Sequence, residues 1–170
     1  MAGRIQSEIK KRHAFERVAQ EVFLNLQKTA DCLMADVTEF LKPHGISPTQ
    51  YNVLRILRGE GAGCCAGGQA DPAAKGLACR EIGERMITRD PDMTRLLDRL
   101  DDRGLIARER DKADRRMIST RITDAGLELL KAIDAPLLEL HEKQLGHLGG
   151  AKLEDLLTLL EEVRGRCIKE

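Results

Sequence analysis

Apolar residues recur at intervals of three and four along most of this chain, and this spacing restricts the fold more than any other feature. Over residues 15–41, apolar positions alternate with charged ones, which predicts one long amphipathic helix of about seven turns. A stripe with the same period runs from Leu153 to Val163. Because aromatic residues make up only 2% of the sequence, a helical core of aliphatic side chains is favoured over a β-sandwich.

Turn and capping residues divide this pattern into separate helices. Pro43 and Gly45 end the first helix, because the residue before a proline avoids the helical region and glycine permits a reversal. Ser47, Pro48 and Gln50 have the spacing of a capping box and begin a second helix. Glycines then predict its end at residues 59–61. The Gly/Ala-rich, non-periodic residues 59–77 that follow predict a flexible surface insertion.

Two shorter helices are predicted next. The first covers residues 78–87, with Ile82, Met86 and Ile87 facing inward. The second begins with Asp90 as its cap and Pro91 as its first residue, with Thr88 as an alternative cap half a turn earlier. Its buried stripe is Met93, Leu96, Leu97 and Leu100.

A β-hairpin and two long helices complete the expected order. Alternating residues predict strands around 105–110 and 117–122, joined by "DKADRR". Thr123 then caps a long helix in which Pro136 is expected to produce a kink or an interruption. "GHLGG" separates that helix from the last one.

Positive charge is concentrated on the hairpin. Residues 103–121 contain seven Lys or Arg and three acidic residues, a local net charge of +4, whereas the whole chain has a formal net charge of zero. Local charge guides association with nucleic acid more directly than the total does. A solvated hairpin with no partner would show the same composition, so the elements before it decide between the two interpretations.

Those elements fit a helix-turn-helix, and the hairpin fits a wing. Residues 94–126, "TRLLDRLDDRGLIARERDKADRRMISTRITDAG", resemble the MarR family of winged-helix transcriptional regulators, and "GISPTQYNVLRIL" at 45–57 is similar to the family's second helix. The resemblance implies a mainly α fold with a small β-hairpin wing and long N- and C-terminal dimerisation helices. It implies a winged helix-turn-helix lobe over 45–124, with dimerisation helices at 1–44 and 125–170.

The predicted DNA contacts lie on the second short helix and on the wing. A helix N-terminus can enter the major groove, where Thr and Arg contact phosphate and Arg also pairs with guanine. Asp92 either accepts from a cytosine amine or complements the helix dipole, and we favour the dipole. In the family pattern, Asp114 orients a neighbouring arginine of the wing. The predicted DNA-binding set is Arg89, Asp92, Thr94, Arg95, Arg99, Lys112, Arg115 and Arg116.

The terminal helices predict a dimer. Their stripes, which include Leu127, Leu130, Ile133, Leu137 and the residues from 153 to 163, are too apolar for exposed rods. In the MarR family such helices form a homodimer, which would place two recognition helices about 34 Å apart on a near-palindromic operator. The alternative is that these stripes pack within one chain. The family's usual mechanism is repression relieved by a ligand or an oxidant, and a small-molecule inducer commonly enters a cleft between the dimer and DNA-binding lobes.

Cysteines supply an alternative function. Cys64 and Cys65 are adjacent in the insertion, and vicinal thiols react with oxidants or bind soft metals, so a thiol-based redox or soft-metal sensor on the same scaffold is the second hypothesis. Cys32 and Cys167 lie on apolar helix faces and are expected in the core, and Cys79 fits either environment. A winged helix used only for protein–protein contact is the third hypothesis.

An enzyme, a cofactor site and a metal site are not expected. The sequence shows no Gly-rich phosphate loop, no metal-ligand set and no pairing of nucleophile and base. It also lacks an apolar run of the roughly 18 residues that span a bilayer, and residues 1–17 have no apolar core of the kind found in signal peptides. A cytoplasmic protein with reduced thiols and no membrane partner is therefore expected.

Overall fold

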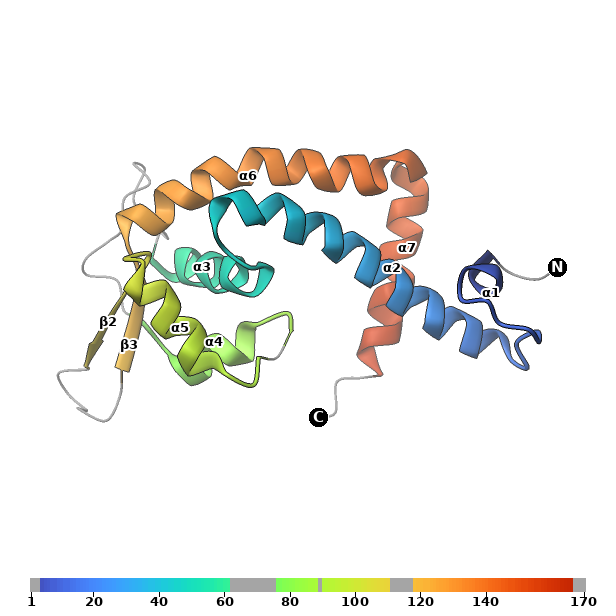
Figure 1. Cartoon of the computed structure of the whole chain (residues 1–170), viewed down its shortest axis with the longest axis horizontal. Coiled ribbons are helices and arrows are strands. Elements are labelled where there is room, and N and C mark those ends of the chain that lie inside the picture. The colour runs from blue at the N-terminus through green and yellow to red at the C-terminus, as the bar shows by residue number, and fades with distance from the viewer. Residues whose placement is uncertain (1–3, 62–75, 89, 111–117, 167–170) are drawn as a thin grey trace.

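The computed structural model describes residues 4–61, 76–88, 90–110 and 118–166 (Figure 1). In Figure 1, α3, α4, α5 and the hairpin form a lobe at one end, α2 and α6 extend from it side by side, and α7 turns away from the far end of α6. The elements are α1 (Arg4–Glu8), α2 (Val18–Leu41), η1 (Lys42–His44), α3 (Pro48–Gly61), β1 (Leu77–Ala78), α4 (Cys79–Arg85), α5 (Met93–Asp102), β2 (Ile106–Arg110), β3 (Ile118–Ile122), α6 (Asp124–Leu145), η2 (Gly146–Leu148) and α7 (Gly150–Gly165).

Local signals placed most helix ends correctly. The capping box of α3 is present, since the Ser47 amide donates to Gln50 Oε1 at 2.9 Å and the Gln50 amide donates to Ser47 Oγ at 3.2 Å. Gly45, with φ of +69°, makes the predicted reversal after α2. Thr123 caps α6, because its Oγ1 accepts from the Gly126 amide at 3.2 Å.

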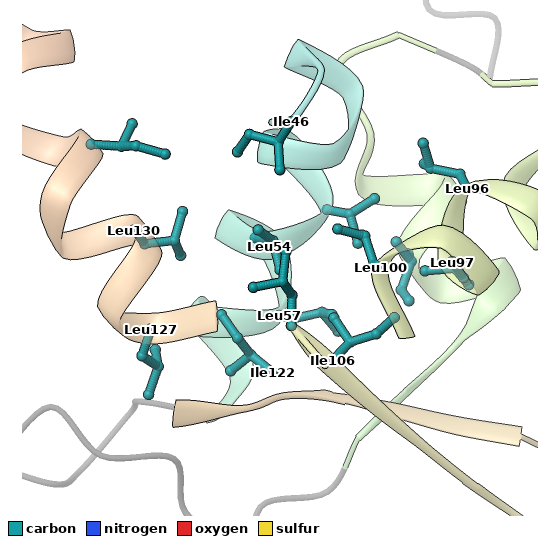
Figure 2. Close-up of a cluster of buried hydrophobic side chains, with 14 of the residues drawn as sticks. Ile46, Leu54, Leu57, Leu96, Leu97, Leu100, Ile106, Ile122, Leu127 and Leu130 are labelled. Atoms are coloured by element: carbon teal, nitrogen blue, oxygen red, sulfur yellow. The ribbon is translucent and has the colours of Figure 1, made fainter. Parts of the chain in front are cut away.

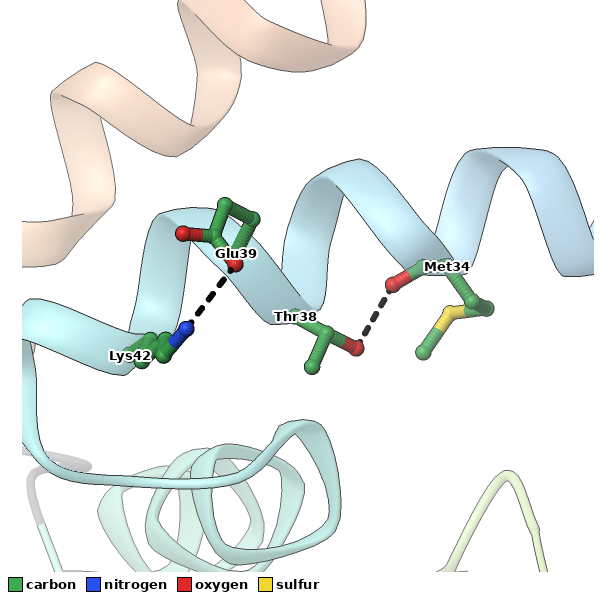
Figure 3. A network of polar contacts seen from close by, with 4 residues as sticks. All are labelled: Met34, Thr38, Glu39 and Lys42. Atoms are coloured by element: carbon green, nitrogen blue, oxygen red, sulfur yellow. Dashed lines mark hydrogen bonds and ion pairs between the residues drawn. The ribbon is translucent and has the colours of Figure 1, made fainter.

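Other details of the helices refine these predictions. Helix α3 ends at Gly61, within the predicted range, so residues 59–61 belong to this helix and not to the predicted insertion. Of the two outcomes predicted at Pro136, the interruption is wrong, because α6 continues to Leu145. A proline removes one amide donor, and packing can still hold the helix together. Helix α1 was not predicted. The C-terminal end of α2, beside the lobe, has a polar surface. There Thr38 Oγ1 donates to the Met34 carbonyl at 2.7 Å, and Lys42 of η1 lies 3.5 Å from Glu39 (Figure 3).

The hairpin belongs to a three-stranded antiparallel sheet in the order β1–β3–β2. Strands β2 and β3 pair from Ile106 opposite Ile122 to Arg110 opposite Ile118. Strand β1 adds Leu77 opposite Thr120, which corrects the expectation that residue 77 belongs to a surface insertion. Two residues give no alternating pattern, so only pairing with β3 makes this segment a strand.

One aliphatic core joins the lobe to the long helices (Figure 2). Leu54 from α3, Leu97 and Leu100 from α5, and Ile106 from β2 are almost completely buried. Contrary to the sequence expectation, the stripe of α6 also packs within the chain. Its buried members are Leu127, Leu130, Ile133 and Leu137.

The exposure of Ile87 and Cys32 differs from the prediction. Ile87 is 84% exposed rather than inward, because α4 ends at Arg85, before the next inward position. Cys32 is exposed and Cys79 partly buried, since α2 leaves most of its length outside the core. Cys167 lies outside the described residues. Within the described ranges, no helix is long and apolar enough to cross a bilayer.

Candidate nucleic-acid interface

The recognition helix α5 begins two residues later than predicted. Asp92, not Asp90, is its N-cap, and Asp92 Oδ1 accepts from the Arg95 amide at 3.3 Å. Asp90 Oδ1 instead accepts from the Asp92 amide at 2.8 Å, so Asp90 forms a turn before the helix, with Pro91 inside that turn. Asp and Asn side chains commonly bond their own backbone two residues on. Asp90 therefore forms the turn before the helix, and Asp92 caps the helix. Asp92 thereby stabilises the end of α5 nearest the predicted DNA face.

Helix α5 separates apolar and polar residues cleanly. Leu96, Leu97 and Leu100 are buried, whereas Thr94 and Arg95 in the first turn are exposed. Arg99 follows Arg95 by four residues, so the two guanidinium groups share one face. Neither arginine forms an ion pair with another described residue. The face therefore offers two cations and a hydroxyl to a ligand outside the protein.

Among the four cations of residues 103–121 that the structure describes, three interact with the protein itself. Arg103 donates to the Gly45 carbonyl and, at 3.2 Å, to the His44 carbonyl, which ties the end of α5 to η1. Arg108 on β2 pairs with Asp98 on α5. Arg121 on β3 lies 2.7 Å from Glu109 on β2. The charge count of the hairpin thus overstates the positive charge available for DNA.

Of the other cations of this stretch, the structure describes Arg110. Arg110 is exposed at the end of β2 and was not included in the predicted contact set. Five predicted site residues lie outside the described residues, and so do the two cysteines of the alternative hypothesis. These residues are Arg89, Lys112, Asp114, Arg115, Arg116, Cys64 and Cys65.

Sequence reasoning missed the inward role of Arg108. Residues two apart on a strand point to the same face, and Ile106 on this face of β2 is buried. The Arg108 side chain is only 17% exposed, whereas that of its partner Asp98 is 52% exposed. Strand alternation counted from Ile106 would have indicated that this arginine faces the interior.

A cavity of about 410 Å³ opens where α3 meets α6. On its wall, Arg58 forms a two-pronged pair with Asp134, in which Nη2 donates to Oδ1 at 3.2 Å. The guanidinium of Arg55 lies 5.9 Å from the ring centre of Tyr51, and burial raises the pKa of Tyr51. The lining residues are Tyr51, Arg55, Arg58, Asp134, Leu137, Leu138 and His141.

Proteins of similar sequence are transcriptional regulators. A family model described as the MarR family matches residues 44–117. The transcriptional repressor MdtR of Bacillus subtilis (strain 168) is 29% identical over 111 residues, which cover 65% of this chain and 63% of that protein. The regulator TtmR of Methylorubrum extorquens (strain PA1) is 29% identical over 72% of this chain and 53% of its own length. The chain thus spans about half to two thirds of these curated relatives.

Solved structures extend the likeness over nearly the whole fold. A MarR transcription factor from Planctomyces limnophilus is 39% identical, covers 86% of this chain and 98% of its own, and superposes with a TM-score of 0.63. CouR from Rhodococcus jostii RHA1, solved with p-coumaroyl-CoA, is 19% identical with a TM-score of 0.68, covering 92% of this chain and 100% of its own, and it supports the fold alone. Together with the helix pair and hairpin described above, these matches show that the chain belongs to the MarR family of DNA-binding, winged helix-turn-helix transcriptional regulators, a family of regulators and not of enzymes.

Proposed function

We propose that this regulator is a homodimeric repressor that binds a near-palindromic operator through α5 and the wing, and that a small ligand releases it. The single observation that carries the proposal is the exposed first turn of α5, where Thr94 and Arg95 face outward above a buried leucine stripe. A helix held in this way can enter the major groove end first.

The proposed contacts follow from the chemistry of each side chain. Arg95 and Arg99 contact phosphate or a guanine edge, and Thr94 contacts phosphate. Asp92 acts through the helix N-terminus, where its carboxylate already accepts a backbone amide. On the wing we propose minor-groove contact by Lys112, Arg115 and Arg116, with Asp114 orienting an arginine. Arg89 precedes the helix and completes the set.

Exposed apolar side chains support the dimer. On α2, Val18 is 77% and Phe23 is 58% exposed, and on α7, Leu157 is 55% and Leu159 is 59% exposed. No described residue of α7 is buried, and Figure 1 shows α7 at the far end from the lobe. Leaving this many large apolar side chains in water is costly. A second copy related by a two-fold axis would cover it and would present two copies of α5 to one duplex.

The cavity between α3 and α6 supports the ligand step. It lies at the junction of the winged lobe and a long helix, so an occupant would contact both. Its apolar leucines, two arginines and the only tyrosine of the chain suit a small amphipathic molecule. A ligand that binds one spacing of the two lobes better than another shifts the population toward that spacing. Because DNA is its target, we place the regulator in the cytoplasm.

The test is footprinting on the DNA that flanks the gene encoding this protein. We expect a protected region with two-fold symmetry whose affinity falls steeply with salt. Arg95→Ala and Arg99→Ala should each weaken binding and lower the salt slope by about one. Lys131→Ala removes an exposed cation of α6 that pairs with Glu128 and serves as the control. Absence of binding at low salt would contradict the proposal.

Two variants separate the alternative functions. For a ligand-released repressor, Cys64→Ser combined with Cys65→Ser should leave the effect of oxidant on operator affinity unchanged. A thiol sensor would lose its response to oxidant in this double variant. Arg115→Ala combined with Arg116→Ala should abolish operator affinity, whereas a winged helix used only for protein contact would keep whatever weak affinity it had.

A further inference from the structure

The ion pair between Asp98 and Arg108 joins the recognition helix to the wing. Arg108 Nη1 donates to Asp98 Oδ1, which links the middle of α5 to the second residue after Ile106 on β2. Arg108 belongs to the positive stretch that first suggested DNA binding, yet only 17% of its side chain is exposed. The guanidinium is therefore directed toward the protein at the point where the two DNA-contacting elements meet.

Arg108 also has a buried polar neighbour in the sheet, Thr120. Arg108 pairs directly with Thr120 of β3 in the register of the sheet, so their side chains lie on one face. Thr120 is 1% exposed. Among the described residues, Arg108 Nε and Thr120 Oγ1 are the buried side-chain polar atoms that lack a hydrogen-bond partner. At this step of the ladder, a donor and an acceptor on one face of the sheet are therefore both unsatisfied within the described residues.

Asp98, the partner of Arg108, lies on the face of α5 that is proposed to meet DNA. Asp98 follows Thr94 by four residues and Arg95 by three, so all three lie on neighbouring turns of the face proposed to meet DNA. An unpaired carboxylate there would repel phosphate. Pairing with Arg108 neutralises the carboxylate and, because both partners are held by regular structure, fixes the distance from α5 to the hairpin.

We propose that Arg108 is a positioning residue that sets the geometry of the wing relative to α5 through Asp98, and that it does not itself contact phosphate. The proposal rests on the proposed binding of DNA through α5. It assigns to the pair an effect on operator affinity that neither residue would produce as a surface charge. The opposite role, direct phosphate contact by Arg108, predicts the opposite sign for Asp98→Asn and a changed salt slope for Arg108→Gln.

The experiment measures affinity for the footprinted operator and for a scrambled duplex, at several salt concentrations, by fluorescence anisotropy of the labelled DNA. Asp98→Asn and Arg108→Gln should each weaken operator binding by about tenfold and leave the salt slope unchanged. The double variant should bind no more weakly than either single variant. Arg108→Lys, which retains a cation able to reach Asp98, should recover part of the loss.

A charge-matched control separates positioning from simple electrostatics. Glu109→Gln also removes one negative charge from the lobe and breaks the pair with Arg121, and it should change operator affinity by less than about twofold. Thermal unfolding of each variant checks that the fold persists. If Arg108→Gln does not fold, Asp98→Asn still decides the outcome, because Asp98 is half exposed.

Two results would overturn the proposal. If Arg108 contacts phosphate, Asp98→Asn frees it and tightens binding, and Arg108→Gln lowers the salt slope by about one. Additive losses in the double variant would also contradict a shared positioning role. Failure of the unmodified protein to bind any flanking DNA would instead contradict the proposed function, so the two failures are distinguishable.

Discussion

At the scale of single residues, Gly126 connects the hairpin to α6. A Cβ at this position would lie 2.3 Å from the Leu105 carbonyl oxygen and 2.7 Å from Ile122 Cγ1. The Gly126 amide also donates to the Thr123 hydroxyl that caps α6. The glycine is therefore required for close approach of strand and helix and not for an unusual backbone angle.

Gly126→Ala should destabilise the fold by about 1–3 kcal/mol, because the methyl group forces backbone atoms apart. Chemical denaturation followed by circular dichroism measures the change in the free energy of unfolding. Gly59→Ala in α3 is the matched control, since a Cβ there meets nothing within 4 Å, and it should stabilise the helix by about 0.5 kcal/mol. Equal effects of the two substitutions would contradict this account of Gly126.

At the scale of elements, the sequence predicts what local chemistry decides. Caps such as Thr123, and the Ser47–Gln50 box, depend on residues three apart, and both were confirmed. Strand β1 was missed because it exists through pairing with a strand about 40 positions away in the chain. The start of α5 was misplaced because Asp90 and Asp92 are both good caps, and only the turn between them decides which one is used.

The same distinction applies to the site. The exposed face of α5 follows from helical period, so Thr94, Arg95 and Arg99 were identified from spacing alone. The inward orientation of Arg108 follows from strand alternation, but its pairing with Asp98 depends on the contact between β2 and α5, which residue composition does not reveal. Charge counts find a basic hairpin, but only the packed fold shows which cations are already paired.

Tyr51 reports on the packing of α3 against α6. Burial raises the pKa of its hydroxyl above the ordinary value of 10, the nearby Arg55 opposes this shift, and Asp134 adds to it. A raised folded pKa means that the contribution of the neutral hydroxyl to stability is complete below about pH 10 and is lost as the pH rises through the folded pKa.

The chain has one tyrosine and no tryptophan, so tyrosinate absorbance in a pH titration reports this residue alone. We expect the midpoint in the native protein to lie above the midpoint in denaturant, and Arg55→Ala to raise the native midpoint further. Circular dichroism at each pH verifies that the protein stays folded. A native midpoint at or below the unfolded one would show that the ring is not buried between these helices.

At the scale of the whole molecule, the apolar surfaces of α2 and α7 predict the assembly. Phe23→Asp or Leu157→Asp places a charge in the surface proposed to meet the second copy, so we expect sedimentation to show a monomer that no longer gives a two-fold footprint. Ile87→Asp is the control, because Ile87 is 84% exposed on the winged lobe and should leave the dimer intact. Dimers that persist in both α2 and α7 variants would place the interface elsewhere.

The continuity of α6 has a mechanical consequence. This single helix begins at the last strand of the hairpin and ends beside α7, and with 22 residues it measures about 33 Å. It therefore acts as a stiff lever that connects the hairpin to α7 and to the surface proposed to meet a second copy. A tilt of about 5° over that length displaces one end by about 3 Å, close to the rise of one base pair. A regulator built on such a lever can lose its grip on an operator while every helix and strand stays intact.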